Sequence, residues 1–228
     1  MNAIEVRGLS VSIKEDDRLL LDCVDLTIAK GECVGLVGLS GCGKSVLAKS
    51  IAGIIPTLIP LELQGEILLF GKKVSELSPL EKIETIGYVF QNADNQMVSS
   101  EVEAELAFGG ENLCLPVEEI ERRISKTLEQ LNMTAYRFAN TNALSGGQKQ
   151  LIALGSILTL QPNILICDEI LCQLDEESVA RVVEILKKLR ATGITILIIE
   201  HDLKKLEFAD EIYVIKEQKL TRFEGELE

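Results

Sequence analysis

Residues 38–45 read Gly38-Leu39-Ser40-Gly41-Cys42-Gly43-Lys44-Ser45. The stretch matches the phosphate-binding pattern G-x-x-x-x-G-K-[ST] at every fixed position. A short apolar segment that favours a β-strand precedes it at residues 33–37, and residues 45–52 have helical character. Glycines in such a loop let backbone N–H groups turn inward around phosphate oxygens, and the N-terminus of the following helix favours an anion. The sequence therefore predicts a nucleotide-binding α/β fold built around this loop.

Two side chains at the end of the loop carry the expected chemistry. Lys44 is expected to reach the β- and γ-phosphates of ATP, and Ser45 is expected to offer its hydroxyl to Mg²⁺. The alternative is a glycine-rich turn that matches by chance, and the strand and helix on either side argue against it. ATP, bound by the whole loop, and Mg²⁺ are therefore the predicted cofactors.

Length, charge and hydropathy exclude several classes of protein. The 228 residues suffice for one α/β domain that carries an insertion. The net charge of -13 disfavours nucleic acid as a partner, since a phosphate backbone needs clustered Lys and Arg. The most apolar stretch, residues 51–70, contains Pro56, Pro60 and Glu62, so it is not expected to span a membrane.

The order of the expected elements places a helical insertion between two halves of a sheet. Helical character begins at residue 101 and continues to residue 136, and from residue 147 onward helices alternate with strands. Such alternation argues for parallel strands joined by helical crossovers. In the first half, strands are expected at residues 3–6, 24–28, 33–37, 65–71 and 86–90.

We therefore expect one domain over residues 1–228, with a mainly parallel sheet at its core. The core covers about residues 1–95 and 145–228, and an α-helical subdomain covers about residues 96–144. The first three strands are expected to form a β-rich edge that faces the nucleotide.

Two carboxylates follow an apolar strand in the second half of the chain. Asp168 and Glu169 come directly after residues 164–167. Open α/β sheets bind ligands at the carboxyl ends of their strands, so we expect Asp168 to contact Mg²⁺, usually through water, and Glu169 to act as general base or to orient the attacking water. Gln91 ends the strand at residues 86–90, and its amide is expected to touch Mg²⁺ or the attacking water. The alternatives are a solvated acidic turn and an ordinary polar loop residue.

His201 is the single histidine of the chain and directly follows Glu200 after the strand at residues 194–199. An imidazole at this end of a strand can donate a hydrogen bond to a γ-phosphate oxygen and hold the geometry of hydrolysis. A lone histidine is more often a surface or capping residue. The phosphate loop and the two carboxylates favour the catalytic interpretation here.

A second anion-binding element lies at the start of an expected helix. It reads Leu144-Ser145-Gly146-Gly147-Gln148, so a hydroxyl and several backbone N–H groups gather at the helix N-terminus. Because each chain already has a phosphate site at Lys44, the second element is expected to bind the ATP of a second copy in a two-fold dimer. Asp175, which can cap the helix that starts at residue 176, is expected near that interface.

The order of these motifs resembles the ABC ATPases over essentially the whole chain. More narrowly, the stretches at residues 89–96 (VFQNADNQ), 101–109 (EVEAELAFG) and 200–202 (EHD) resemble the ATPase subunits of energy-coupling factor transporters. The resemblance implies the P-loop NTPase fold of the ABC ATPase type. The catalytic residues that it implies are Lys44, Gln91, Glu169 and His201.

The resemblance also implies partners and a location. Such a subunit energises the uptake of vitamins or transition-metal ions from the cytoplasmic face of the membrane, where it is bound peripherally. Its partners are a second ATPase subunit, identical or different, a transmembrane coupling protein and a substrate-binding membrane protein. A coupling helix enters the groove near Gln91 and the helical insertion in these assemblies, so Met97, Val98 and Phe108 are contact candidates.

Four positions depart from the family pattern, and none of them removes a catalytic group. Ile13 stands where many relatives have an aromatic that stacks on adenine. Leu151 replaces an arginine, Ile170 a proline, and Cys172 a small hydroxyl residue or alanine. Two other functions remain open. A non-transport ABC ATPase would normally bring tandem cassettes, a coiled-coil insertion or a basic surface, and steady ATP hydrolysis would exclude a regulatory subunit with negligible turnover.

Overall fold

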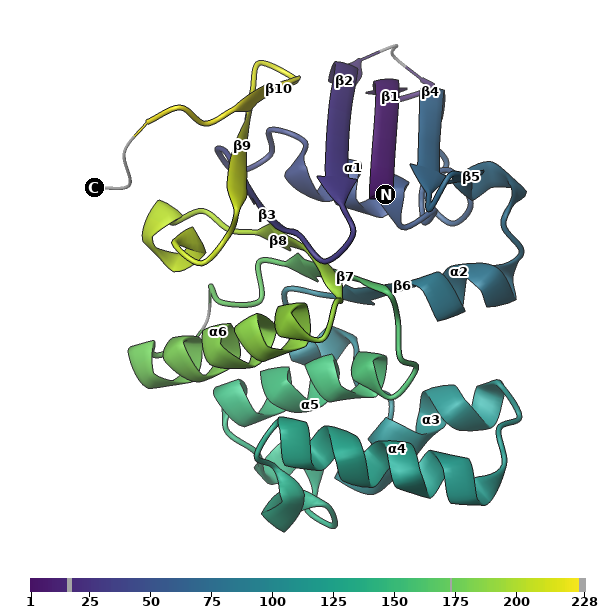
Figure 1. Ribbon diagram of the computed structural model, residues 1–228, viewed down its shortest axis with the longest axis vertical. Coiled ribbons are helices and arrows are strands. Elements are labelled where there is room, and N and C mark those ends of the chain that lie inside the picture. The colour runs from purple at the N-terminus through teal and green to yellow at the C-terminus, as the bar shows by residue number, and fades with distance from the viewer. Residues whose placement is uncertain (16–17, 173, 226–228) are drawn as a thin grey trace.

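A six-stranded sheet runs through the middle of the molecule (Figure 1) in the computed structural model, which describes residues 1–15, 18–172 and 174–225. Its strands are β3 Cys33–Val37, β6 Ile86–Val89, β7 Ile164–Asp168, β8 Thr195–Ile199, β9 Glu211–Lys216 and β10 Lys219–Arg222. In space they follow the order β10-β9-β3-β8-β7-β6. Neighbours are parallel except at the edge, where β10 pairs antiparallel with β9. The mainly parallel core predicted from the sequence is confirmed.

A second, antiparallel sheet forms the β-rich edge. Its strands are β1 Asn2–Ser12, β2 Leu19–Ala29, β4 Glu62–Leu69 and β5 Lys72–Lys73, in the order β2-β1-β4-β5. The prediction was wrong to include residues 33–37 in this edge, because β3 pairs with β8 and β9 in the central sheet. Every residue of β3 is buried, as is usual for a strand covered on both faces.

Helices cover the central sheet on both faces (Figure 1). The α-helices are α1 Lys44–Ile51, α2 Pro79–Thr85, α3 Val102–Asn112, α4 Val117–Gln130, α5 Gly146–Leu158 and α6 Glu176–Ala191. Short 3₁₀ turns are η1 Val74–Glu76, η2 Ala93–Asn95, η3 Thr134–Tyr136, η4 Thr141–Ala143 and η5 Leu203–Leu206. The helix α1 packs on the face shared with the antiparallel sheet, whereas α5 and α6 pack on the other face, with α3 and α4 beyond α5.

Alternating side chains of the central strands contribute to two separate hydrophobic cores. On β7, Leu165 and Cys167 pack with the helices α3 to α6, whereas Ile164 and Ile166 pack with α1 and the antiparallel sheet. Successive side chains of a strand point to opposite faces, so burial on both sides requires an unbroken apolar run. This arrangement fixes the position of the polar residues that follow each strand.

The helices predicted at residues 101–136 are confirmed, and one further helix was not predicted. The helices α3 and α4 lie within the segment predicted to be helical, and Pro116 precedes α4 as its N-cap. The helix α2 was not predicted, although Ser78 and Glu81 form a capping box around Pro79. None of the helices in the described part of the chain is long and apolar enough to cross a membrane.

Close packing of α5 on the sheet generates a prediction about stability. A Cβ atom on Gly87 of β6 would lie 2.2 Å from Ile157 Cγ2 and 3.1 Å from Pro162 Cγ. Gly87→Ala should therefore lower the free energy of unfolding by about 1–3 kcal/mol, measured by urea titration, because the neighbours must move. In an Ile157→Ala background the same substitution should cost less than about half as much. An equal cost in both backgrounds would contradict the packing.

Candidate active site

The phosphate loop joins β3 to α1 and closes around a buried ammonium group. Gly43 has a φ of 111°, and a Cβ atom there would lie 2.9 Å from the carbonyl oxygen of Leu20, so only glycine fits. Lys44 is 4% exposed, and its Nζ donates to the carbonyl oxygens of Gly38 at 2.9 Å and Leu39 at 3.2 Å. The loop is thus shaped to present its lysine at the start of a helix.

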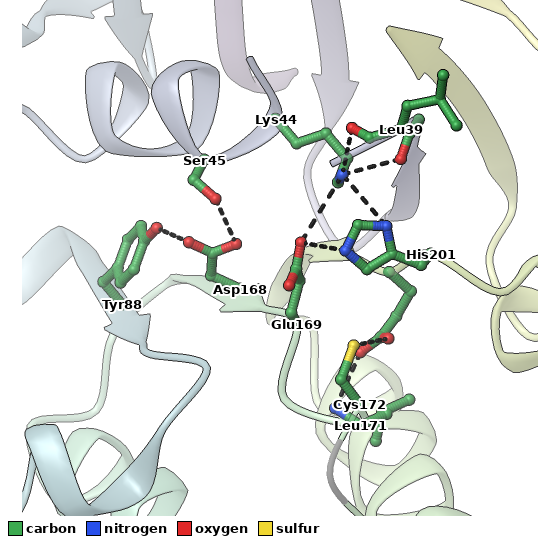
Figure 2. A network of polar contacts seen from close by, with 11 residues as sticks. Leu39, Lys44, Ser45, Tyr88, Asp168, Glu169, Leu171, Cys172 and His201 are labelled. Carbon is green, nitrogen blue, oxygen red and sulfur yellow. Dashed lines mark hydrogen bonds and ion pairs between the residues drawn. The ribbon is translucent and has the colours of Figure 1, made fainter. Parts of the chain in front are cut away.

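Three adjacent parallel strands, β3, β8 and β7, end around this ammonium group (Figure 2). Glu169 directly follows β7, and its Oε1 lies 3.7 Å from Lys44 Nζ. His201 follows β8, with Nε2 2.7 Å from Glu169 Oε1 and Nδ1 3.5 Å from Lys44 Nζ. The structure therefore brings together three predicted catalytic residues that are far apart in the sequence.

The partners of His201 define its tautomer. The carboxylate of Glu169 only accepts hydrogen bonds, so Nε2 carries the hydrogen. The ammonium group of Lys44 only donates, so it faces the lone pair of Nδ1. The tautomer with hydrogen on Nε2 satisfies both neighbours, and the ring connects the loop lysine to the carboxylate.

Asp168 belongs to a second part of the same cluster. It is 6% exposed, and its Oδ1 accepts a hydrogen bond from Ser45 Oγ at 3.0 Å. Its other oxygen, Oδ2, accepts from the hydroxyl of Tyr88 at 2.5 Å. Both oxygens of this carboxylate are therefore oriented by hydroxyl groups, one from α1 and one from β6.

Tyr88 is a site residue that the sequence analysis missed. It lies on β6 next to β7, is 8% exposed, and its ring packs against Phe90 with 4.9 Å between the ring centres. Burial and the adjacent charge of Asp168 raise the pKa of Tyr88, so its hydroxyl remains a donor. The sequence predicts only an apolar strand at residues 86–90. The signal that could have identified Tyr88 as a site residue is its hydroxyl, a polar group within that apolar segment.

The Ser145 element forms the N-terminus of α5, as predicted. Ser145 Oγ accepts from the N–H of Gln148 at 3.3 Å, and Gln148 Oε1 accepts from the N–H of Ser145 at 2.9 Å, which makes a capping box. Ser145 and Gly146 are exposed, while a Cβ atom on Gly147 would lie 2.4 Å from Ser178 Oγ. Among the described residues, no hydrogen bond or ion pair joins this element to the Lys44 cluster.

Three other predicted positions lie outside that cluster. Gln91 is exposed after β6 and makes no hydrogen bond within the described part of the chain. Asp175 is the N-cap of α6, and its Oδ1 accepts from the N–H of Ser178 at 2.8 Å. Ile13 is half-buried at the end of β1, and its N–H donates to the carbonyl oxygen of Arg18 at 3.0 Å. The predicted contacts of Gln91 with Mg²⁺, of Asp175 with a partner and of adenine near Ile13 stay predictions.

Comparisons with known sequences point to one family. Residues 21–171 match the family described as ABC transporter. The energy-coupling factor transporter ATP-binding protein EcfA of Methanosarcina acetivorans is 40% identical over 199 residues, 87% of this chain and 71% of that protein. The cobalt import ATP-binding protein CbiO of Syntrophus aciditrophicus is 36% identical, over 96% of this chain and 77% of that protein. Two relatives from Methanosarcina species are much longer, and the chain spans 34% and 38% of their length.

A solved structure agrees with the fold. The structure of cbiO1 from Clostridium perfringens, part of the ABC transporter complex cbiONQ, has a TM-score of 0.86 at 30% identity. The match covers 96% of this chain and 87% of that one.

The contact between Tyr88 and Asp168 generates a prediction about metal binding. Tyr88→Phe removes the hydroxyl that orients Asp168, so Mn²⁺ should bind about tenfold more weakly in the presence of ATP, as measured by electron paramagnetic resonance. ATP affinity without metal should be unchanged.

Tyr213→Phe provides the matched control, because the hydroxyl of Tyr213 donates to Glu211 Oε2 at 3.0 Å on β9. This variant should bind Mn²⁺ as the unmodified protein does. Equal Mn²⁺ affinity in both variants would show that Tyr88 does not orient a metal ligand.

Proposed function

The chain belongs to the ABC transporter family of ATP-binding subunits and is an ATPase, and we propose that its hydrolysis of ATP drives an importer of the energy-coupling factor type. The substrate class is a vitamin or a transition-metal ion. Relatives that carry the names of an energy-coupling factor ATPase and of a cobalt import ATPase support this proposal. The contacts that select the substrate lie in membrane partners.

The observation that carries the catalytic proposal is the contact of Glu169 with both His201 and Lys44. The side chain of Glu169 is 13% exposed, and its carboxylate lies beside the lysine of the phosphate loop. As a water oxygen bonds to the γ-phosphorus and the bond to the ADP oxygen breaks, Glu169 takes the proton of the water. Lys44 stabilises the charge that develops on the phosphate oxygens. His201 holds the carboxylate in place, and its predicted hydrogen bond to a γ-phosphate oxygen stays a prediction.

Ser45 and Asp168 fit a magnesium ion. A hydroxyl and a carboxylate are the hard oxygen ligands that Mg²⁺ prefers, and these two oxygens lie 3.0 Å apart at the end of the phosphate loop. When bound, Mg²⁺ neutralises charge on the β- and γ-phosphate oxygens. Ser45 would hold it directly, and Asp168 would hold it through water.

A second subunit completes the nucleotide site. The N-terminus of α5 exposes Ser145 and Gly146 and is a favourable position for a phosphate. Each chain already has one phosphate site at Lys44, so a two-fold pair places two ATP molecules between the phosphate loop of one subunit and the Ser145 element of the other. Asp175, exposed at the start of α6, contributes to the same interface. The partner is a second copy of this chain or a related ATPase.

An apolar hollow beside α3 is the proposed contact for the transmembrane coupling protein. A cavity of about 290 Å³ is lined there by Ile83, Val98 and Phe108, which are 40%, 62% and 48% exposed. Such a surface fits the apolar face of a helix. Met97, the third candidate, is partly buried against the hydrophobic core, and its contact with a coupling helix stays a prediction. Docking at this surface would hold the subunit peripherally on the cytoplasmic face of the membrane.

Glu169→Gln tests the catalytic proposal. The amide keeps the shape of the side chain and loses the base, so hydrolysis should fall by about 100-fold or more while ATP affinity changes little. Phosphate release measures the first quantity, and titration with a fluorescent ATP analogue measures the second.

Lys44→Ala is the contrasting variant. It removes the cation at the β- and γ-phosphates, so it should lose ATP affinity as well as hydrolysis. Hydrolysis by Glu169→Gln within about tenfold of the unmodified rate would show that Glu169 is not the base.

A further inference from the structure

The backbone of Glu169 has a conformation that side-chain-bearing residues rarely adopt. Its φ is 56°, in the left-handed region, although the residue is not glycine. Such a conformation persists only where the surrounding structure enforces it. The N–H of Glu169 donates to the carbonyl oxygen of Ile199 at 3.0 Å, and its own carbonyl accepts from the N–H of Cys172 at 3.2 Å. The turn that carries the carboxylate is therefore held partly by the end of β8.

Two further side chains fix this turn at Leu171. The N–H of Leu171 donates to Glu200 Oε1 at 2.9 Å, and its carbonyl oxygen accepts from Lys205 Nζ at 2.7 Å. The other oxygen of Glu200, Oε2, lies 3.3 Å from Cys172 Sγ and accepts from its thiol (Figure 2). Both polar groups of the Leu171 backbone are thus held by residues from the segment that includes His201.

Glu200 is a buried carboxyl group for which the proposed reaction has no direct use. It is 0% exposed, and burial raises its pKa, although its hydrogen bonds to Leu171 and Cys172 and the nearby Lys205 oppose that shift. A fully buried carboxyl group is normally found only where hydrogen-bond partners satisfy both of its oxygens. Here both partners belong to the turn that follows Glu169.

We propose that Glu200 is a positioning residue for Glu169. It holds the turn at Leu171 and Cys172, and this turn holds the left-handed backbone that directs the Glu169 carboxylate towards Lys44 and His201. Lys205 supports the same turn from its carbonyl side. Since Glu200 directly precedes His201 in the chain, one short segment positions both catalytic side chains. The inference rests on the proposed role of Glu169 as general base.

The expected effect of losing Glu200 is on the chemical step. Glu200→Ala leaves the N–H of Leu171 unpaired and lets the turn move, so kcat should fall about tenfold or more, because small displacements of a catalytic group are costly. The KM for ATP should stay within about threefold, since Lys44 and the loop are not altered. Glu200→Gln keeps an oxygen that accepts from Leu171, so it should retain at least about half of kcat.

Glu105→Ala is a matched control for the loss of a buried carboxylate. Glu105 is 2% exposed, and its Oε2 accepts from the N–H groups of Val98 and Ser99 at 2.8 Å each, in the helical part of the molecule. Its removal also leaves backbone groups unpaired, but the isolated subunit should keep kcat within about twofold. A loss of kcat equal to that of Glu200→Ala would show that the effect comes from general destabilisation and would overturn the proposal.

A double-mutant cycle separates this inference from the proposed function. In a Glu169→Gln background, Glu200→Ala should lower the residual hydrolysis by less than about twofold, because the group that it positions is gone. A tenfold further loss would mean that Glu200 acts independently of Glu169 and would overturn the inference. Near-normal hydrolysis by Glu169→Gln alone would instead refute the role of Glu169 itself.

Lys205→Met is the second variant, and it keeps the test open if Glu200→Ala does not fold. It removes the hydrogen bond to the Leu171 carbonyl from the opposite side, so kcat should again fall with little change in the KM for ATP. Unchanged kcat in a folded Lys205→Met protein would contradict the proposal that the turn at Leu171 positions the base.

Discussion

The rest of the site depends on the burial of one positive charge, the ammonium group of Lys44. A buried charge is strongly unfavourable unless hydrogen bonds and opposite charge surround it. Two carbonyl oxygens of the phosphate loop, the carboxylate of Glu169 and the ring of His201 satisfy this requirement. The loop, Glu169 and His201 come from different parts of the chain, and the parallel sheet brings them together because β3, β8 and β7 are neighbouring strands. The packing of the strands therefore also determines where the proposed catalytic groups lie.

In the proposed two-subunit arrangement, one chain holds only part of an ATP site. The groups around Lys44 are the proposed cation, base and metal ligands, and they lie at one edge of the sheet. The exposed N-terminus of α5 is the proposed second anion-binding site, and among the described residues no hydrogen bond or ion pair joins it to that cluster. If hydrolysis requires both the Lys44 cluster and the N-terminus of α5, it requires two subunits. ATP binding and dimer formation are then thermodynamically linked.

The sequence predicted those parts of the site that depend on local patterns. The loop and its helix follow from the spacing of Gly38, Gly43 and Lys44, and the start of α6 follows from Asp175 as a cap. Asp168 and Glu169 were assigned correctly to the end of a strand, because an apolar run in an alternating α/β pattern has to end at a sheet edge. The structure places this pair at the end of β7, where it meets the loop.

The missed features depend on contacts between residues far apart in the chain. Tyr88 is 80 residues from Asp168, and Leu171 is 29 residues from Glu200. In a single sequence, a tyrosine in an apolar strand is interpreted as core, and no local pattern around Glu200 indicates that it binds the turn after Glu169. The assignment of β3 to the edge sheet failed for a related reason, since an apolar segment carries no signal for which strands it pairs with. Only the topology decides these three cases.

The most direct test compares the mass in solution of Glu169→Gln with that of the same variant carrying an added negative charge at the Ser145 element. A Cβ atom on Gly146 meets nothing within 4 Å, so Gly146→Asp should fold, and its carboxylate suits a helix N-terminus but repels a phosphate. In sedimentation velocity with ATP and Mg²⁺, Glu169→Gln should form a dimer, and the double variant with Gly146→Asp should stay monomeric with the same ATP affinity. A Glu169→Gln protein that remains monomeric, or a dimer that Gly146→Asp does not disrupt, would contradict the account.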